Sequence, residues 1–239
     1  MNEPLAANGQ SAAPIDAGTA YDTPDLAQRQ RVLRNTYWLL AVSLVPTVAG
    51  AWVGVSTGIV SAMGPVVSMI VFLAGAFGLM FAIERKKDSA AGVYLLLGFT
   101  FFMGLMLSRL VGQVLGLRNG ASLVMTAFGG TAAIFFAMAT LATVIKRDLS
   151  GMAKFLFVGA LIVLVAGIAN VFLQSSALML ALLVLCLGIF SAFMLVDIKR
   201  VLDGGETNYI SATLAIYLDI YNVFHSLLAL LGIFGGERD

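Results

Sequence analysis

Long apolar stretches, interrupted by short polar ones, dominate the pattern along the chain. No Asp, Glu, Lys, Arg or His occurs from Asn35 to Ile83, a run of 49 positions, or from Phe155 to Val196, a run of 42 positions. Because a helix that crosses a bilayer needs about 20 apolar residues, each run is long enough for two crossings. The pattern therefore predicts several membrane-spanning helices.

Charged or turn-forming residues divide this pattern into seven segments. The predicted spans are residues 37–58, 66–83, 91–108, 121–145, 155–173, 177–196 and 210–234. Each should be a helix, because backbone groups that face lipid must be satisfied within their own segment. The sequence thus predicts an all-α membrane protein with seven transmembrane helices. They form one domain at residues 31–239, after a polar, disordered cytoplasmic tail at residues 1–30.

Composition agrees with this class and excludes others. The chain is 60% hydrophobic and only 11% charged, against about 25% charged residues in an ordinary soluble domain. A net charge of +1 leaves no basic surface of the kind that binds nucleic acid. Cys186 is the single cysteine, so an intrachain disulfide is excluded and a metal–thiolate cluster is not expected.

The Lys and Arg residues between the spans predict the orientation. Eleven of the 14 fall before the first span or in the second, fourth and sixth connections, and three fall on the opposite side. Since basic loops stay in the cytoplasm, the N-terminus is expected there and, after seven crossings, the C-terminus outside. A re-entrant last segment is the alternative for residues 210–234.

One segment carries ionisable side chains. Asp219 is the only charged residue inside the predicted spans, and Asn222 and His225 follow at steps of three. An aspartate at a helix centre costs about 2.5–3.5 kcal/mol to insert, so it suggests a function. The three residues form a polar stripe that must face the bundle interior or water. Two interpretations stay open: an ion or proton pathway, or a buried network that fixes this helix.

Asp197 ends the sixth predicted span and is either a cytoplasmic boundary residue or a partner of Asp219. Two carboxyl groups in one low-dielectric site resist ionising together, so such a pair could sense pH and bind a divalent cation when ionised. Sequence spacing alone does not bring the two together. Arg85 and Lys86 could latch onto the pair, or they could be ordinary basic anchors.

Enzymatic motifs are missing from the sequence. The chain has one histidine, no G-x-S-x-G elbow before a serine, and no P-loop or dinucleotide fingerprint. We therefore expect no catalytic residues and no permanently bound cofactor.

Several short stretches resemble the Bax inhibitor family, and within it the bacterial YccA branch. The stretches are Gly204–Ile210 (GGETNYI), Ile216–Asn222 (IYLDIYN), Arg31–Tyr37 (RVLRNTY), Gly129–Ala132 (GGTA), Arg147–Ser150 (RDLS) and Ala169–Gln174 (ANVFLQ). The resemblance runs from about Arg31 to the end of the chain. It implies a bacterial inner-membrane protein with six helices around a central C-terminal helix.

The resemblance also implies two activities. Family members are described as pH-sensitive calcium leak channels, and Asp197 and Asp219 match their acidic sensor pair. Either Arg85 or Lys86 falls where a basic residue is said to latch the closed state. Proteins of the YccA branch are instead known as modulators of the membrane protease FtsH, and the N-terminal tail would be the part of this chain that engages it. The expected partners are therefore the lipid bilayer and FtsH, with calcium as the permeant ion.

Overall fold

A computed structural model describes residues 26–236, and within that range the chain is helical apart from its connections. The helices are α1 (Leu26–Thr57), α2 (Ile59–Ala62), α3 (Pro65–Lys86), α4 (Ala90–Leu115), α5 (Gly120–Val144), α6 (Ser150–Leu173), α7 (Ser176–Leu202) and α8 (Tyr209–Phe234). All except the single-turn α2 are long and apolar enough to cross a membrane. The predicted all-α fold with seven transmembrane helices is confirmed.

The helices extend beyond several of the predicted spans. α4 continues to Leu115 and α7 to Leu202, seven and six residues past the predicted ends. The reason is that hydropathy marks the part of a helix that contacts lipid, whereas hydrogen bonding continues into the polar end. α1 begins at Leu26, so residues 26–30 are helical rather than part of the tail. Residues 1–25 of the predicted tail lie outside the described residues.

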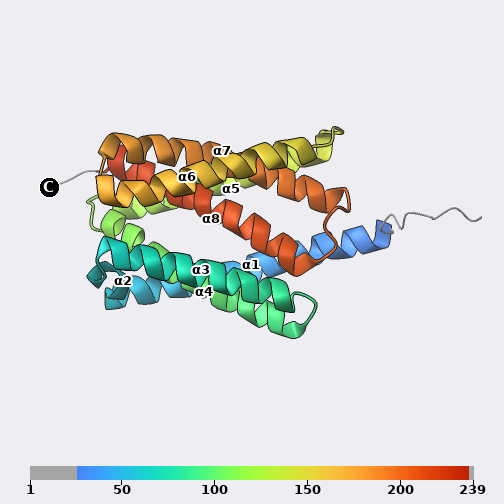
Figure 1. Cartoon of the computed structure of the whole chain (residues 1–239), viewed down its shortest axis with the longest axis horizontal. Helices are drawn as coiled ribbons and strands as arrows, with labels where there is room; N and C mark the ends of the chain where they lie inside the picture. The colour runs from blue at the N-terminus through green and yellow to red at the C-terminus, as the bar shows by residue number, and fades with distance from the viewer. Residues whose placement is uncertain (1–25, 237–239) are drawn as a thin grey trace, which may run out of the picture.

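Successive long helices run in alternating directions (Figure 1). The start of α1 and the α3–α4, α5–α6 and α7–α8 connections therefore lie at one end of the bundle, on the right in Figure 1. The eleven Lys and Arg residues counted above lie in these segments or in the helix ends next to them. We call this the basic end.

α8 is the most enclosed of the seven long helices. Half of its most apolar 18-residue stretch is buried inside the protein, against at most 39% of the corresponding stretch in each of the other six helices. It packs on α7, α5, α1 and α4, and less extensively on α3. It is unbroken over 26 residues, about 39 Å long, which is enough to cross a hydrocarbon core of about 30 Å. An arrangement of six helices around α8 stays a prediction.

α1 and α4 approach each other closely through glycines. A Cβ atom at Gly50 would collide with the backbone of Phe101, and one at Gly104 with the backbone of Thr47. A Cβ atom at Gly54 would collide with the side chain of Ser108. Small residues permit such an approach between membrane helices. Gly112, farther along α4, makes only ordinary contact with Val55, so the close approach does not extend that far.

Candidate functional site

Asp219 is buried at the centre of the molecule. It is the eleventh residue of α8, about 15 Å along the helix from Tyr209. Its side chain is 3% exposed, and its Oδ2 atom has no hydrogen-bond partner among the described residues. A carboxyl group in this position is costly unless another group or a ligand satisfies it.

Asp197 of α7 lies beside Asp219, and their carboxyl groups are within hydrogen-bonding range of each other. Asp197 is half-buried, so the pair extends from the protein interior toward a more accessible edge. A hydrogen bond between two carboxyl groups requires a proton on one of them. Two acids this close therefore favour a state in which one of them keeps its proton.

The length of α7 explains why these residues meet. The predicted sixth span stops at Val196, which would leave Asp197 at the membrane boundary and far from Asp219 in depth. Because α7 continues to Leu202, Asp197 lies five residues inside the helix. The connection to α8 is six residues long, so the two helices pack side by side along their length.

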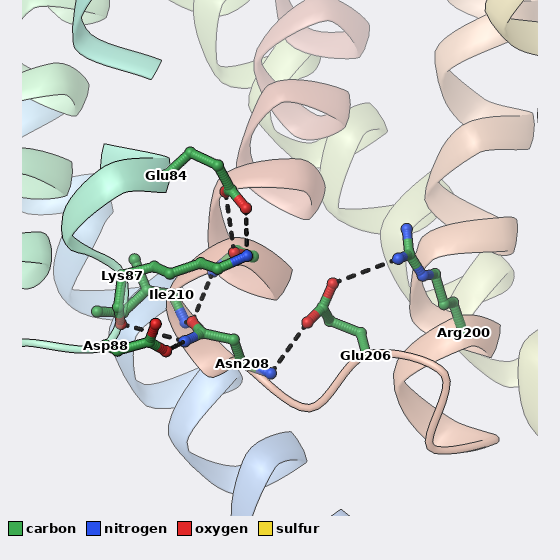
Figure 2. Close-up of polar contacts among 8 residues, drawn as sticks. Glu84, Lys87, Asp88, Arg200, Glu206, Asn208 and Ile210 are labelled. Atoms are coloured by element: carbon green, nitrogen blue, oxygen red, sulfur yellow. Dashed lines mark hydrogen bonds and ion pairs between the residues drawn. The ribbon is translucent and has the colours of Figure 1, made fainter. Parts of the chain in front are cut away.

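A cluster of polar side chains at the basic end includes two residues that interact electrostatically with Asp197. Asp197 is within electrostatic range of Arg200 and Glu206, and Arg200 Nη2 lies 3.6 Å from Glu206 Oε2 (Figure 2). We call the following set the loop cluster: Glu84, Lys87, Asp88, Arg200, Glu206, Asn208 and Ser211. It joins the α3–α4 connection to the α7–α8 connection.

Asn208 is the central member of the loop cluster. Its side-chain oxygen accepts hydrogen bonds from the N–H groups of Ile210 and Ser211, at 2.9 and 3.2 Å, and so caps α8. Its amide nitrogen donates to Asp88 Oδ1 at 2.9 Å and to the Lys87 carbonyl at 3.1 Å (Figure 2). Asn208 thus fixes the start of α8 to the end of α3. An asparagine just before the last apolar segment is the sequence signal for this cap.

Glu84 strengthens the same junction. It pairs with Lys87, the residue that follows the end of α3, and it accepts a hydrogen bond from the Ser211 hydroxyl at 3.1 Å. The hydrogen bond to Glu84 raises the pKa of Lys87, so Lys87 stays charged at the basic end.

In the structure, Asn222 and His225 contact neighbouring residues of α8 rather than the acid pair. The Asn222 side-chain amide donates to the Leu218 carbonyl of its own helix at 2.8 Å. His225 stacks on Tyr221, with ring centroids 6.4 Å apart. Of the predicted polar stripe, Asp219 therefore meets an acid of another helix, whereas Asn222 and His225 contact residues of α8 itself.

Neither predicted latch residue contacts the acid pair. Arg85 lies over the ring of Phe81 at 5.4 Å, and both Arg85 and Lys86 are exposed. Within the described residues, the cation in electrostatic range of Asp197 is Arg200, which comes from α7 rather than from α3.

Sequence reasoning missed the role of Tyr217. Its hydroxyl lies 2.9 Å from Thr47 Oγ1 of α1 and donates to the Thr100 carbonyl of α4 at 3.4 Å. Its ring is 1% exposed. Tyr217 therefore connects α8 to the α1–α4 seam, half a turn from Asp219. A tyrosine in an apolar helix was a weak signal, because its partners lie 170 and 117 residues away.

The acid pair alone is a sparse metal site. Calcium takes six to eight oxygen ligands, and the described residues contain no group of three or more His, Cys, Asp or Glu side chains that could hold a metal. A cation at Asp197 and Asp219 would therefore need water or carbonyl oxygens as its remaining ligands.

Seven membrane-spanning helices with a carboxyl pair buried between the last two define a polytopic membrane protein with an intramembrane acidic site. Residues 29–236 match the family model described as "Inhibitor of apoptosis-promoting Bax1". The chain belongs to the Bax inhibitor family.

Relatives of known sequence support the same assignment. The chain is 35% identical over 214 residues to the Escherichia coli protein called "Modulator of FtsH protease YccA", covering 90% of this chain and 95% of that one. It is 36% identical over 206 residues to an uncharacterized membrane protein of Vibrio cholerae, covering 86% and 91%. An E. coli relative with the same coverage is called "Inner membrane protein YccA". The chain is a multi-pass inner-membrane protein.

Proposed function

We propose that the protein is a pH-sensitive calcium leak channel of the inner membrane, gated by the pair Asp197 and Asp219. The single observation that carries the proposal is the contact between these two buried carboxyl groups, with Asp219 Oδ2 left without a partner. A structural network would be expected to satisfy such an atom. A site that exchanges protons or ions requires an atom that is free to take a new partner.

The gate works through the number of protons on the pair. With one proton, the two carboxyl groups attract each other and hold α7 against α8. With none, two negative charges repel at short range in a low-dielectric site. Arg200 and Glu206 then compete for Asp197, so the protonation state is transmitted to the loop cluster and the start of α8.

The same carboxylates suit the permeant ion. Calcium prefers carboxylate oxygen ligands, and a site with few protein ligands binds it weakly enough to release it. Asp197 and Asp219 therefore act in this proposal as both pH sensor and transient calcium ligands. Asn222 and His225, farther along α8, line the remainder of the path, and Arg85 or Lys86 acts as a latch in a second conformation.

Calcium flux into proteoliposomes tests the proposal. We expect the native protein to carry a flux that changes between pH 6 and pH 8, and both Asp197→Asn and Asp219→Asn to lose or shift that response. Asp203→Asn is the matched control, because Asp203 lies at the same end of α7 and pairs with Lys199 at 2.6 Å. No flux above that of empty liposomes at any pH, from folded protein, contradicts the channel.

The orientation belongs to the same proposal. The eleven Lys and Arg residues at the basic end favour a cytoplasmic position for that end, and the odd number of crossings then puts the C-terminus in the periplasm. A reporter fused after Asp239 that is active only in the periplasm would check it.

A second function is favoured by a different observation, the 35% identity to the E. coli modulator of FtsH over 90% of this chain. In this alternative, the protein binds the protease through its N-terminal tail and the connections at the basic end. Deleting residues 2–25, which precede α1, should abolish co-purification with FtsH and leave calcium flux unchanged. Asp219→Asn should have the reverse effect, so the two functions are separable.

A further inference from the structure

The basic end carries a polar cavity that is separate from the acid pair. It has a volume of about 420 Å³ and is lined by Gln28, Arg31, Val32, Asn35, Thr207 and Tyr209. We call it the α1 cavity. Its walls are the first turns of α1 and the connection that leads into α8. They belong to segments more than 170 residues apart in the sequence.

Five of the six residues that line the α1 cavity carry a hydrogen-bond donor in their side chains. Arg31 is its only charged residue, and no carboxylate lines it. The other polar side chains are two amides and two hydroxyls. Within the described residues, none of these five side chains makes a hydrogen bond or an ion pair with another residue. An exposed guanidinium surrounded by unengaged donors is the arrangement that binds a phosphate group.

The loop that forms one wall is held in place by other contacts. Gly204 has a left-handed backbone with φ of 79°, and the Arg29 side chain packs against it, so that a Cβ atom there would lie 2.6 Å from Arg29 Nε. The Thr213 hydroxyl, one turn into α8, donates to the Thr36 carbonyl of α1 at 3.3 Å. These contacts hold the α7–α8 connection and the start of α8 against α1, so the α1 cavity between them is preformed.

The depth of the α1 cavity indicates where the phosphate comes from. Trp38 of α1 and Tyr94 of α4 are 69% and 75% exposed. Such aromatic residues favour the membrane interface, where lipid headgroups begin. Arg31 lies seven residues before Trp38, about 10 Å further out along α1. This places its guanidinium at the level of the phosphates of the adjacent leaflet.

We propose that the α1 cavity binds the phosphodiester headgroup of an anionic phospholipid. Arg31 contacts the phosphate oxygens, while Asn35, Thr207 and Tyr209 donate to the phosphate or to the glycerol of the headgroup. The acyl chains extend along the apolar surface of α1 below Asn35. This assigns a ligand to the Arg31–Tyr37 and Gly204–Ile210 stretches, whose residues Arg31, Thr207 and Tyr209 take no part in the acid pair.

Lipid titration of the purified full-length protein tests the site. The native protein in a neutral detergent would be titrated with phosphatidylglycerol, and binding would be followed by native mass spectrometry. We expect saturable binding of phosphatidylglycerol and much weaker binding of zwitterionic phosphatidylcholine. Arg31→Gln should weaken binding about fivefold or more, the loss expected when a charge-assisted contact to an anion is removed.

Arg34→Gln is the matched control. Arg34 is also exposed, lies less than one helical turn after Arg31 on α1, and does not line the α1 cavity. It should change affinity less than about twofold, as expected for an exposed charge. Arg31→Lys keeps the charge but loses the planar fork, so it should fall between the native protein and Arg31→Gln. Equal losses in Arg31→Gln and Arg34→Gln would overturn the proposal in favour of diffuse attraction to the basic end.

Two further arms identify the source of the anion. Glycerol 3-phosphate and inorganic phosphate carry the anion without acyl chains, and binding of either as tightly as phosphatidylglycerol would overturn the lipid assignment. Residues 1–25 contain four acidic side chains and no Lys or Arg, so the tail is a rival occupant. Deleting residues 2–25 should leave lipid affinity unchanged, and a large increase would show that the tail fills the cavity instead.

Discussion

The α1–α4 seam and the α7–α8 seam are both contacts between long membrane helices, yet they are built from different residues. The first uses glycines that bring two backbones together, without charged side chains between them. The second holds two carboxyl groups, one of them with an unpartnered oxygen. Two closely packed backbones fit together in one arrangement, because any shift makes their atoms collide. The interaction between two acids, in contrast, changes with every proton that the pair gains or loses. The comparison suggests a fixed half and a responsive half of the bundle.

Tyr217 connects the two halves. It lies two residues before Asp219 on α8 and bonds to Thr47 and Thr100 at the α1–α4 seam. A shift of α8 that follows a change at the acid pair would have to break or stretch these contacts. The seam therefore provides the reference against which α8 moves.

The largest effect on stability is expected at the α1–α4 seam. Gly104→Ala inserts a methyl group into the backbone of Thr47, and overpacking of this kind costs about 1–3 kcal/mol. Thermal unfolding in detergent would measure the loss. Gly98→Ala on the same helix has open space around its Cβ position and should be neutral or slightly stabilising. Equal effects at both positions would refute the close-packed seam.

Asn208→Ala should have the next largest effect. It removes the cap of α8, worth about 1 kcal/mol, together with the bonds to Asp88 and the Lys87 carbonyl. We expect faster amide hydrogen exchange in the first turn of α8 and the last turn of α3, with little change in α6. Asn119→Ala is a comparison at the opposite end of the bundle, where that side chain donates to the Gly235 carbonyl. Uniform changes along all helices would contradict a local junction.

Tyr217→Phe separates packing from hydrogen bonding. It keeps the buried ring and removes the hydroxyl, so the expected cost is about 1 kcal/mol. Tyr94→Phe, at a tyrosine that is 75% exposed, should change nothing. If Tyr217 is the connection described here, its phenylalanine variant should also broaden the pH response of calcium flux. An unchanged response would assign Tyr217 to stability alone.

The smallest effect concerns the start of α6, away from both seams. Asp148 accepts hydrogen bonds from the hydroxyl and the N–H of Ser150, at 2.6 and 2.9 Å, and these lower the pKa of Asp148. A lowered pKa means that this stabilisation is present above the unfolded value, about 3.9, and is lost as pH falls through the folded value. The unfolding midpoints of the native protein and Asp148→Asn should therefore converge below pH 4. A constant difference down to pH 2 would contradict the assignment.

The fold could largely be predicted from the sequence, because membrane crossing imposes a length and an apolar composition on every span. Seven segments were therefore identified, although their ends were not. The ends matter for function: Asp197 appears as a boundary residue when α7 is taken to stop at Val196, and as a partner of Asp219 when it continues to Leu202. Hydropathy does not report how far a helix continues into polar residues.

Of the candidate site, Asp219 could be predicted from the sequence, but the polar residues around it could not. Asp219 is conspicuous because a charge in an apolar segment is rare. Arg200 and Glu206 are in electrostatic range of Asp197, and Asn208 joins α8 to the end of α3, but each looks like an ordinary loop residue until α3, α7 and α8 are brought together (Figure 2).

The most direct test of the central claim is whether Asp197 and Asp219 act as one unit. Calcium flux from pH 6 to pH 8 would be compared for Asp197→Asn, Asp219→Asn and the double variant, each reconstituted at equal density and shown to be folded. A shared proton predicts that each single variant loses the pH response of the native protein, and that the double variant loses nothing more. Independent and additive effects of the two substitutions, or a native response that persists in the double variant, would contradict a gate built on this pair.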